Sequence, residues 1–290
     1  MRILFFAVGQ ELLGIEYLSS VLKRDGHEVE LVFDPGLEDF LGFIDLKFLK
    51  KLKDENWYLE RIKSFKPDLI GFSCLTNLYS FACDKAKILK KHFDIPIAIG
   101  GIHPTILPEY VIENSNFDII CIGEGDEAVP ELMAKMKDGK DILDTQNFWF
   151  RNKNEIIKNG VRPLVQNLDS LPFPDRELFY KYGCFAGILY FISGRGCPFT
   201  CSYCCHHFLQ EKYRGLGKYV RKRSVDNVLE EIKFCISRYK VKSLYSMDDL
   251  FTINTEWIKE FSEKYRKISD LPIYCHVRPG TLNRDIASSL

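Results

Sequence analysis

Short apolar runs alternate with amphipathic stretches over residues 1–140, and this alternation restricts the fold more than any other feature of the chain. Five runs are candidate strands: Ile3–Val8, Glu28–Phe33, Leu69–Ser73, Pro96–Ile99 and Phe117–Ile122. They are almost continuously apolar, which is typical of parallel strands covered on both faces. Between them apolar residues recur at helical spacing, and Gly26 stands where a first helix would end. We expect an α/β fold whose N-terminal part is a doubly wound, flavodoxin-like parallel sheet.

Small and turn-forming residues follow the expected strands. A ligand of such a sheet binds beyond the carboxyl ends of the strands, where glycine lets it approach the backbone closely. The candidate contacts at this edge are Gly14, Ser73, Leu75, Thr76, Gly100, Gly101, His103, Gly123, Glu124 and Gly125. Ordinary turn chemistry explains any single loop, but four such loops on one edge favour a ligand site. The GxGxxG fingerprint is absent after the first strand, which disfavours a dinucleotide.

A CxxxCxxC motif directly follows another apolar run, Gly187–Ser193, and consists of Cys197, Cys201 and Cys204. Three thiolates at this spacing can ligate three irons of a 4Fe-4S cluster and leave the fourth iron open to a further ligand. Catalytic loops at the carboxyl ends of strands are the rule in α/β barrels. The motif therefore predicts a cluster with a chemical role.

Zinc and disulfides are the alternatives for these cysteines. A structural zinc site needs four ligands, and Cys205, His206 or His207 could supply the fourth. A disulfide framework is typical of small secreted chains, which this chain does not resemble. The spacing favours the iron–sulfur cluster.

The remainder of the chain divides into two further segments. Residues 141–186 are expected to be a linker, with a β-hairpin over 148–157 and two prolines, Pro172 and Pro174, that impose an extended path. Residues 187–290 contain three strand–helix repeats, in which Ser224 is the expected N-cap of the first helix. Such repeats predict the first part of a (β/α) barrel.

The cysteine motif, with an aromatic residue before its last cysteine, resembles the signature of radical S-adenosylmethionine (SAM) enzymes. The first part of the chain resembles the cobalamin-binding domain found ahead of many such enzymes, because Ser73-Cys74-Leu75 matches its SxL element and Gly100-Gly101 its GG element. The chain departs from a related corrinoid motif, DxHxxG, at Glu11, which stands where the cobalt-ligating histidine would be.

The resemblance implies residues 1–140 as a cobalamin-binding domain and 187–290 as the first half of a partial radical SAM barrel. The implied cofactors are a 4Fe-4S cluster, SAM and cobalamin. Cys197, Cys201 and Cys204 would ligate the cluster, and the loops listed above would contact cobalamin. The implied SAM contacts are Tyr203 at the adenine (or else in the core), Asp248 or Asp249 at the methionine ammonium, and Arg278 at the carboxylate.

The resemblance further implies reductive cleavage of SAM to a 5′-deoxyadenosyl radical and methyl transfer from methylcobalamin to an unactivated carbon of a small molecule. An electron donor such as flavodoxin or ferredoxin would be the partner. One alternative is an oxidative cyclase or rearrangement enzyme without net methylation. The other is a truncated, inactive corrinoid-binding module.

The composition limits the class of protein, its partners and its location. Hydrophobic residues make up 46% of the 290 residues, enough for a sizeable core. Forty basic residues balance 40 acidic ones, which indicates neither a nucleic-acid nor a membrane partner. No segment approaches the about 18 apolar residues of a membrane-spanning helix. Ten cysteines and no recognisable signal sequence predict a cytoplasmic location.

Overall fold

The computed structural model describes residues 1–34, 55–153, 155–184, 187–282 and 284–289, and it divides into two compact units. The first unit contains Met1–Arg162 and Pro174–Cys184, and the second contains Pro163–Phe173 and Phe185–Leu290. Residues 141–186 are thus shared between the units. In the described part of the chain, no helix is long and apolar enough to cross a bilayer.

The first unit is built on a seven-stranded sheet with the order β2-β1-β3-β4-β5-β6-β7. Five parallel strands come first: β1 (Arg2–Val8), β2 (Glu28–Asp34), β3 (Leu69–Ser73), β4 (Ile97–Gly100) and β5 (Ile119–Cys121). Their order is that of a flavodoxin-like sheet, so the predicted doubly wound fold is confirmed. The strand bounds agree with the apolar runs of the sequence to within a few residues.

The expected hairpin is formed by β6 (Phe148–Asn152) and β7 (Glu155–Lys158). It extends the first sheet, because β6 pairs antiparallel with β5 and places Ile119 opposite Phe150. Phe148 and Phe150 are almost completely buried. This burial explains why the hairpin joins the sheet instead of standing apart as a connector.

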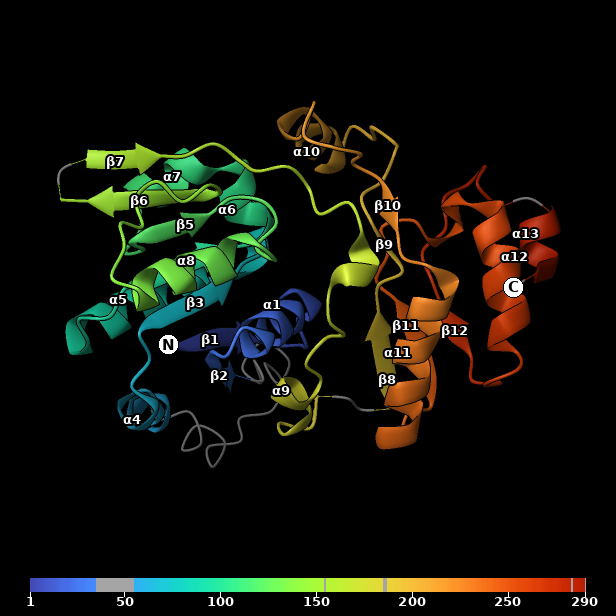
Figure 1. Ribbon diagram of the computed structural model, residues 1–290, viewed down its shortest axis with the longest axis horizontal. Helices are drawn as coiled ribbons and strands as arrows, with labels where there is room; N and C mark the ends of the chain where they lie inside the picture. Colours follow the sequence, from blue (N-terminus) through green and yellow to red (C-terminus); the bar gives the residue numbers. More distant parts are fainter. Residues whose placement is uncertain (35–54, 154, 185–186, 283, 290) are drawn as a thin grey trace, which may run out of the picture. The chain divides into compact units, whose positions relative to one another are not determined.

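Helices cover both faces of the first sheet (Figure 1). One face packs against α4 (Glu55–Phe65), α5 (Tyr79–His92), α6 (Ile102–Ile106) and α7 (Pro108–Glu113). The other packs against α1 (Leu13–Arg24), α8 (Ala128–Lys137) and α9 (Glu177–Tyr180). Alternation along β1 supplies both cores, since Leu4 and Phe6 face one layer and Ile3 and Phe5 the other. Because both faces are covered, the parallel strands are almost continuously apolar, apart from Glu28 and Glu30 on the edge strand β2.

The second unit contains a three-stranded parallel sheet with the order β12-β11-β8. The strands are β8 (Ile188–Phe191), β11 (Ser243–Ser246) and β12 (Ile273–Tyr274), and they alternate with α11 (Val225–Arg238), α12 (Thr255–Tyr265) and α13 (Arg284–Ser289). A short ribbon of β9 (Gly194–Arg195) and β10 (Arg221–Lys222), together with α10 (His206–Lys212), lies between β8 and α11 in the chain. The three expected strand–helix repeats are therefore present.

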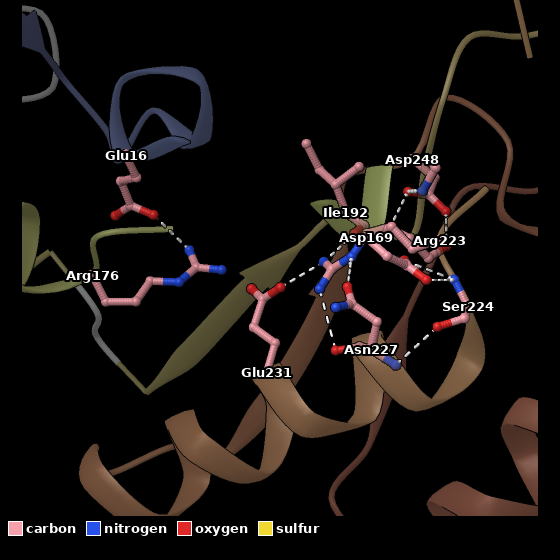
Figure 2. Close-up of polar contacts among 11 residues, drawn as sticks. Glu16, Asp169, Arg176, Ile192, Arg223, Ser224, Asn227, Glu231 and Asp248 are labelled. Carbon is pink, nitrogen blue, oxygen red and sulfur yellow. Dashed lines mark hydrogen bonds and ion pairs between the residues drawn. The ribbon is translucent and has the colours of Figure 1, made fainter. Parts of the chain in front are cut away.

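Polar contacts fix the entry to α11 (Figure 2). The Ser224 hydroxyl accepts from the backbone N–H of Asn227 at 3.2 Å, so the predicted N-cap is present. Asp169, in the 163–173 segment, accepts from the Ser224 N–H at 3.0 Å. Arg223 is buried and donates to Glu231 at 2.5 Å and to the Ile192 carbonyl at 2.9 Å. These contacts join the end of β8, the start of α11 and the 163–173 segment.

Candidate functional site

The loops after β3 and β4 interlock at the carboxyl edge of the first sheet. Gly101 has φ +101°, and a Cβ there would lie 2.8 Å from both the N and the O of Cys74. The Cys74 N–H donates to Gly100 O at 2.8 Å, and the His103 N–H donates to Cys74 O at 3.2 Å. Only glycine permits this approach, so the predicted Gly100-Gly101 pair serves a close contact between the loops.

The loop after β5 is tied to the same cluster. The Thr105 hydroxyl donates to Gly101 O at 2.7 Å and accepts from the Gly123 N–H at 2.9 Å. The Asn147 amide donates to the Glu124 carbonyl at 2.9 Å. Three of the predicted ligand loops are consequently held as one body. Thr105 joins the loops after β4 and β5, a role that the sequence pattern did not predict.

A cavity of about 80 Å³ lies beneath these loops, inside the first unit. Its lining combines apolar side chains with small residues of the strand ends, including Ser73, Gly100, Gly101, Gly123 and Gly125. The cavity is mainly apolar with backbone groups at its mouth, which is the lining chemistry of a ligand site, but its volume is smaller than that of a typical ligand pocket. At the same edge Leu75, Ile102, Leu107 and Tyr110 are exposed large hydrophobic side chains. Thr76 and Gly14 are also exposed.

His103 is buried at this edge with one ring nitrogen lacking a partner. Its side chain is 5% exposed, its Nδ1 lies 3.2 Å from Thr76 Oγ1, and its ring lies 4.3 Å from the Tyr79 ring. Among the described residues, nothing forms a hydrogen bond with its Nε2. Burial lowers the pKa of His103, which favours the neutral imidazole. A buried polar atom without a partner is uncommon in folded proteins, and a polar group of a bound ligand would satisfy it.

The loop after β1 carries a buried cluster of charges that sequence reasoning missed. Arg176 donates to Glu11 Oε1 and to Glu16 Oε2, each at 2.7 Å, and all three side chains are almost inaccessible to solvent (the Glu16 contact is drawn in Figure 2). Asp175 beside it accepts from Ser19 at 2.6 Å and Lys23 at 2.5 Å. Glu11 is therefore engaged by an arginine at the position where the corrinoid motif has a histidine.

The cysteine loop of the second unit begins after β9 and ends at α10. Gly196 has φ +87°, and a Cβ there would overlap the carbonyl oxygen of Tyr219. The Gln210 amide donates to Cys197 O at 2.9 Å and to Phe199 O at 3.2 Å. The Cys204 N–H donates to Cys201 O at 3.0 Å. The backbone of the loop is thus fixed by a glycine turn and by one glutamine of α10.

The three motif cysteines share this loop as free, half-buried thiols. Burial raises the pKa of the Cys197 thiol, and the nearby charges of Asp249, Cys204 and Cys201 add to that rise. In the described part of the chain, no three His, Cys, Asp or Glu side chains are arranged as a metal site. Three accessible thiols in one loop nevertheless fit the donor set of an iron–sulfur cluster, because metal binding itself draws ligands together.

Of the predicted SAM contacts, Tyr203 lies within this loop and Arg278 lies against it. Tyr203 is 92% exposed, so it has no packing role in the core. The Arg278 guanidinium carbon lies 4.0 Å from the centre of the Phe199 ring, which is within the range of a cation–π contact. Arg278 is thereby held against the cysteine loop.

The structure separates the two aspartates that sequence reasoning left as alternatives. Asp248 is 4% exposed and accepts from the N–H groups of Ser193 at 2.7 Å and Gly194 at 3.0 Å. It also accepts from the Ser193 hydroxyl and pairs with Lys222 at 3.0 Å. Asp249 has a side chain that is 49% exposed and lies 3.0 Å from His206 Nε2. Asp248, which follows β11, is therefore occupied by contacts to Ser193, β9 and β10, whereas the Asp249 side chain is accessible.

Comparison with known proteins finds a matching family model for part of the chain and relatives along most of it. Residues 9–133 match the model of the B12 binding domain family. An uncharacterized methyltransferase of Pyrococcus horikoshii is 29% identical over 286 residues, covering 96% of this chain and 57% of that protein. An anaerobic magnesium-protoporphyrin IX monomethyl ester cyclase of Rubrivivax gelatinosus is 25% identical, covering 92% of this chain and 48% of the cyclase.

A solved structure shares the fold along the whole chain. The radical SAM methyltransferase TsrM of Kitasatospora setae, with tryptophan and a SAM analogue bound, superposes with a TM-score of 0.74 at 16% identity. It covers 100% of this chain, which in turn covers 57% of TsrM. This chain spans about half the length of the relatives it matches. The resemblance inferred from the sequence motifs is confirmed.

Proposed function

We propose that this chain, whose residues 9–133 match the B12 binding domain family, is the cobalamin- and cluster-binding part of a radical SAM enzyme, most simply a methyltransferase. The observation that carries the proposal is the three-thiol loop near the carboxyl end of β8, in a chain that also has the B12-binding match. The named activities of the relatives, methyl transfer among them, agree with it.

Cobalamin is the ligand that we assign to the first unit. The nucleotide tail would lie at the mouth of the apolar cavity, along the small residues at the ends of β3, β4 and β5. The exposed Leu75, Ile102 and Tyr110 side chains offer apolar surface to the corrin. His103 Nε2, which has no partner among the described residues, would exchange a hydrogen bond with a polar group of the ligand. Glu11 would not coordinate cobalt, because Arg176 holds its buried carboxylate.

A 4Fe-4S cluster and SAM are the ligands that we assign to the second unit. Cys197, Cys201 and Cys204 would hold the cluster. When bound, the cluster supplies one electron for SAM cleavage, and cobalamin supplies the methyl group. Arg278 would attract the methionine carboxylate, and Tyr203 would lie along the adenine. For the whole enzyme we propose a small-molecule substrate, and a small electron-transfer protein as the electron donor.

The test is reductive SAM cleavage by anaerobically reconstituted protein. We expect wild-type protein to bind about four irons and four sulfides, as the cluster type requires, and to release 5′-deoxyadenosine with dithionite. Cys201→Ala should do neither. Zinc in place of iron, or equal product from both proteins, would refute the proposal.

A ring cyclase is the second candidate, because the magnesium-protoporphyrin cyclase matches 92% of this chain. SAM carrying a deuterated methyl group separates the two. A methyltransferase passes the label to product, whereas a cyclase product contains none.

A further inference from the structure

Three side chains form a continuous polar chain beside the cysteine loop. His206, at the start of α10, lies 2.6 Å from Tyr219 Oη through its Nδ1 and 3.0 Å from Asp249 Oδ2 through its Nε2. The three residues come from separate segments: Tyr219 precedes β10, and Asp249 follows β11. His206 is 8% exposed, whereas the Asp249 side chain is 49% exposed. The chain therefore runs from a buried phenol to an accessible carboxylate.

The chemistry of the partners fixes the direction of the hydrogen bonds. A carboxylate only accepts, so the Nε2 of His206 carries the proton that it donates to Asp249. The Nδ1 of a neutral imidazole then accepts, and the Tyr219 hydroxyl donates to it. Burial, with the charge of Asp249 next in size, raises the pKa of Tyr219, so the phenol stays protonated as a donor. Each bond in such a chain strengthens the next.

Tyr219 is itself fixed to the cysteine loop. Its carbonyl oxygen occupies the space beside Gly196 that only glycine leaves open. Its ring packs near His206, with centroids 5.8 Å apart. Tyr219 is thereby held beside Gly196, where the loop begins, and His206 lies where the loop ends. A carboxylate oriented through them has a set position relative to the three thiols.

Asp248 cannot take the role of Asp249. Its oxygens already accept from two backbone N–H groups and pair with Lys222. An ammonium group could bind Asp248 only at the expense of these buried contacts, which is costly. Asp249 is the neighbouring carboxylate with an accessible side chain.

We propose that His206 and Tyr219 are positioning residues that orient the Asp249 carboxylate to receive the methionine ammonium of SAM at the cysteine loop. This inference rests on the proposed function, since it presumes that SAM binds there. It separates Asp248, which holds the strands together, from Asp249, which contacts the cofactor. It also assigns a role to His206, which the sequence motif left unexplained.

The experiment uses the full chain, purified and reconstituted anaerobically, with SAM affinity and the electron paramagnetic resonance (EPR) spectrum of the reduced cluster as readouts. His206→Phe keeps the ring shape and removes both hydrogen bonds. His206→Gln keeps an N–H donor near the Nε2 position. Tyr219→Phe removes the hydroxyl alone. Glu211→Gln, which changes an exposed acid on α10, is the matched control.

We expect His206→Phe to weaken SAM binding about tenfold, the low end for a lost hydrogen bond to a charged group. The SAM-induced change in the EPR spectrum should shrink, while iron and sulfide content stays at the wild-type level. His206→Gln should recover most of the affinity, Tyr219→Phe should fall between them, and Glu211→Gln should match wild type.

The outcomes separate this inference from the proposed function. If wild-type protein binds SAM and His206→Phe binds it equally well, the positioning role is wrong and the proposed function stands. If His206→Phe loses its iron, the residue is structural and the inference also fails. If wild-type protein holds a cluster that SAM does not perturb, the proposed function fails together with the inference.

Discussion

Gly101→Ala should disrupt the carboxyl edge of the first sheet more than the addition of one methyl group suggests. Gly101 has φ +101° and ψ −169°, a region that is essentially restricted to glycine. Its new Cβ would meet the N and O of Cys74 at 2.8 Å, and backbone atoms cannot move aside cheaply. We expect this backbone conformation to lower the unfolding free energy of the alanine variant by roughly 2 kcal/mol. The hydrogen bonds that Cys74 makes to Gly100 and His103 would add about 1 kcal/mol each when the loops separate.

Urea unfolding followed by pulsed alkylation of the buried thiols measures this effect in each unit. Cys74 and Cys121 report on the first unit and Cys235 on the second. The expected loss of unfolding free energy, roughly 4 kcal/mol in total from these contributions, should appear at the first two cysteines and not at the third. Cobalamin affinity, followed by visible absorption, should fall as well.

Gly139→Ala is the control for this experiment. Gly139 also has a positive φ, +62°, but a Cβ there would meet nothing within 4 Å. Gly139→Ala should therefore lower the unfolding free energy only through its left-handed backbone conformation, by about 1 kcal/mol. If the two variants lose the same unfolding free energy to within about 1 kcal/mol, the close contact with Cys74 is not the reason for the glycine at position 101, and the reasoning is refuted.

Three further predictions concern stability. Asp248→Asn should destabilise the second unit by roughly 3 kcal/mol, because it leaves the Lys222 cation buried without its partner; no change in alkylation of this unit would contradict the assignment. Ser224→Ala should cost about 1 kcal/mol of unfolding free energy by removing the cap on Asn227, and Ser224→Asn should restore it. Burial raises the pKa of the Cys74 thiol from 9.0 to about 12. The unfolded chain therefore loses this proton first, and stability should fall with rising pH above 9. In urea unfolding repeated across this pH range, the unfolding free energy of Cys74→Ala should fall less steeply with pH than that of wild type, by about 1.4 kcal/mol per pH unit.

The buried charges could not be predicted from the sequence, because they depend on contacts between distant segments. Glu11 and Arg176 are 165 residues apart, and nothing in their local pattern distinguishes them from solvated side chains. The contacts of the Asp249–His206–Tyr219 chain likewise join three separate segments, the end of β11, the start of α10 and the residues before β10. Asp248 and Asp249 are adjacent and identical in type, and only the fold determines that one is buried and the other exposed.

The order of apolar and amphipathic segments determined the doubly wound sheet, and the cysteine spacing together with the paired glycines predicts which loops carry the sites. Both are local properties, since hydrophobic periodicity and ligand spacing act over a few residues. Tertiary structure alone decided where residues 141–186 belong, which carboxylates are engaged and why Gly101 admits no side chain. Each of these depends on which remote segment fills the space beside a residue, and that space exists only in the folded chain.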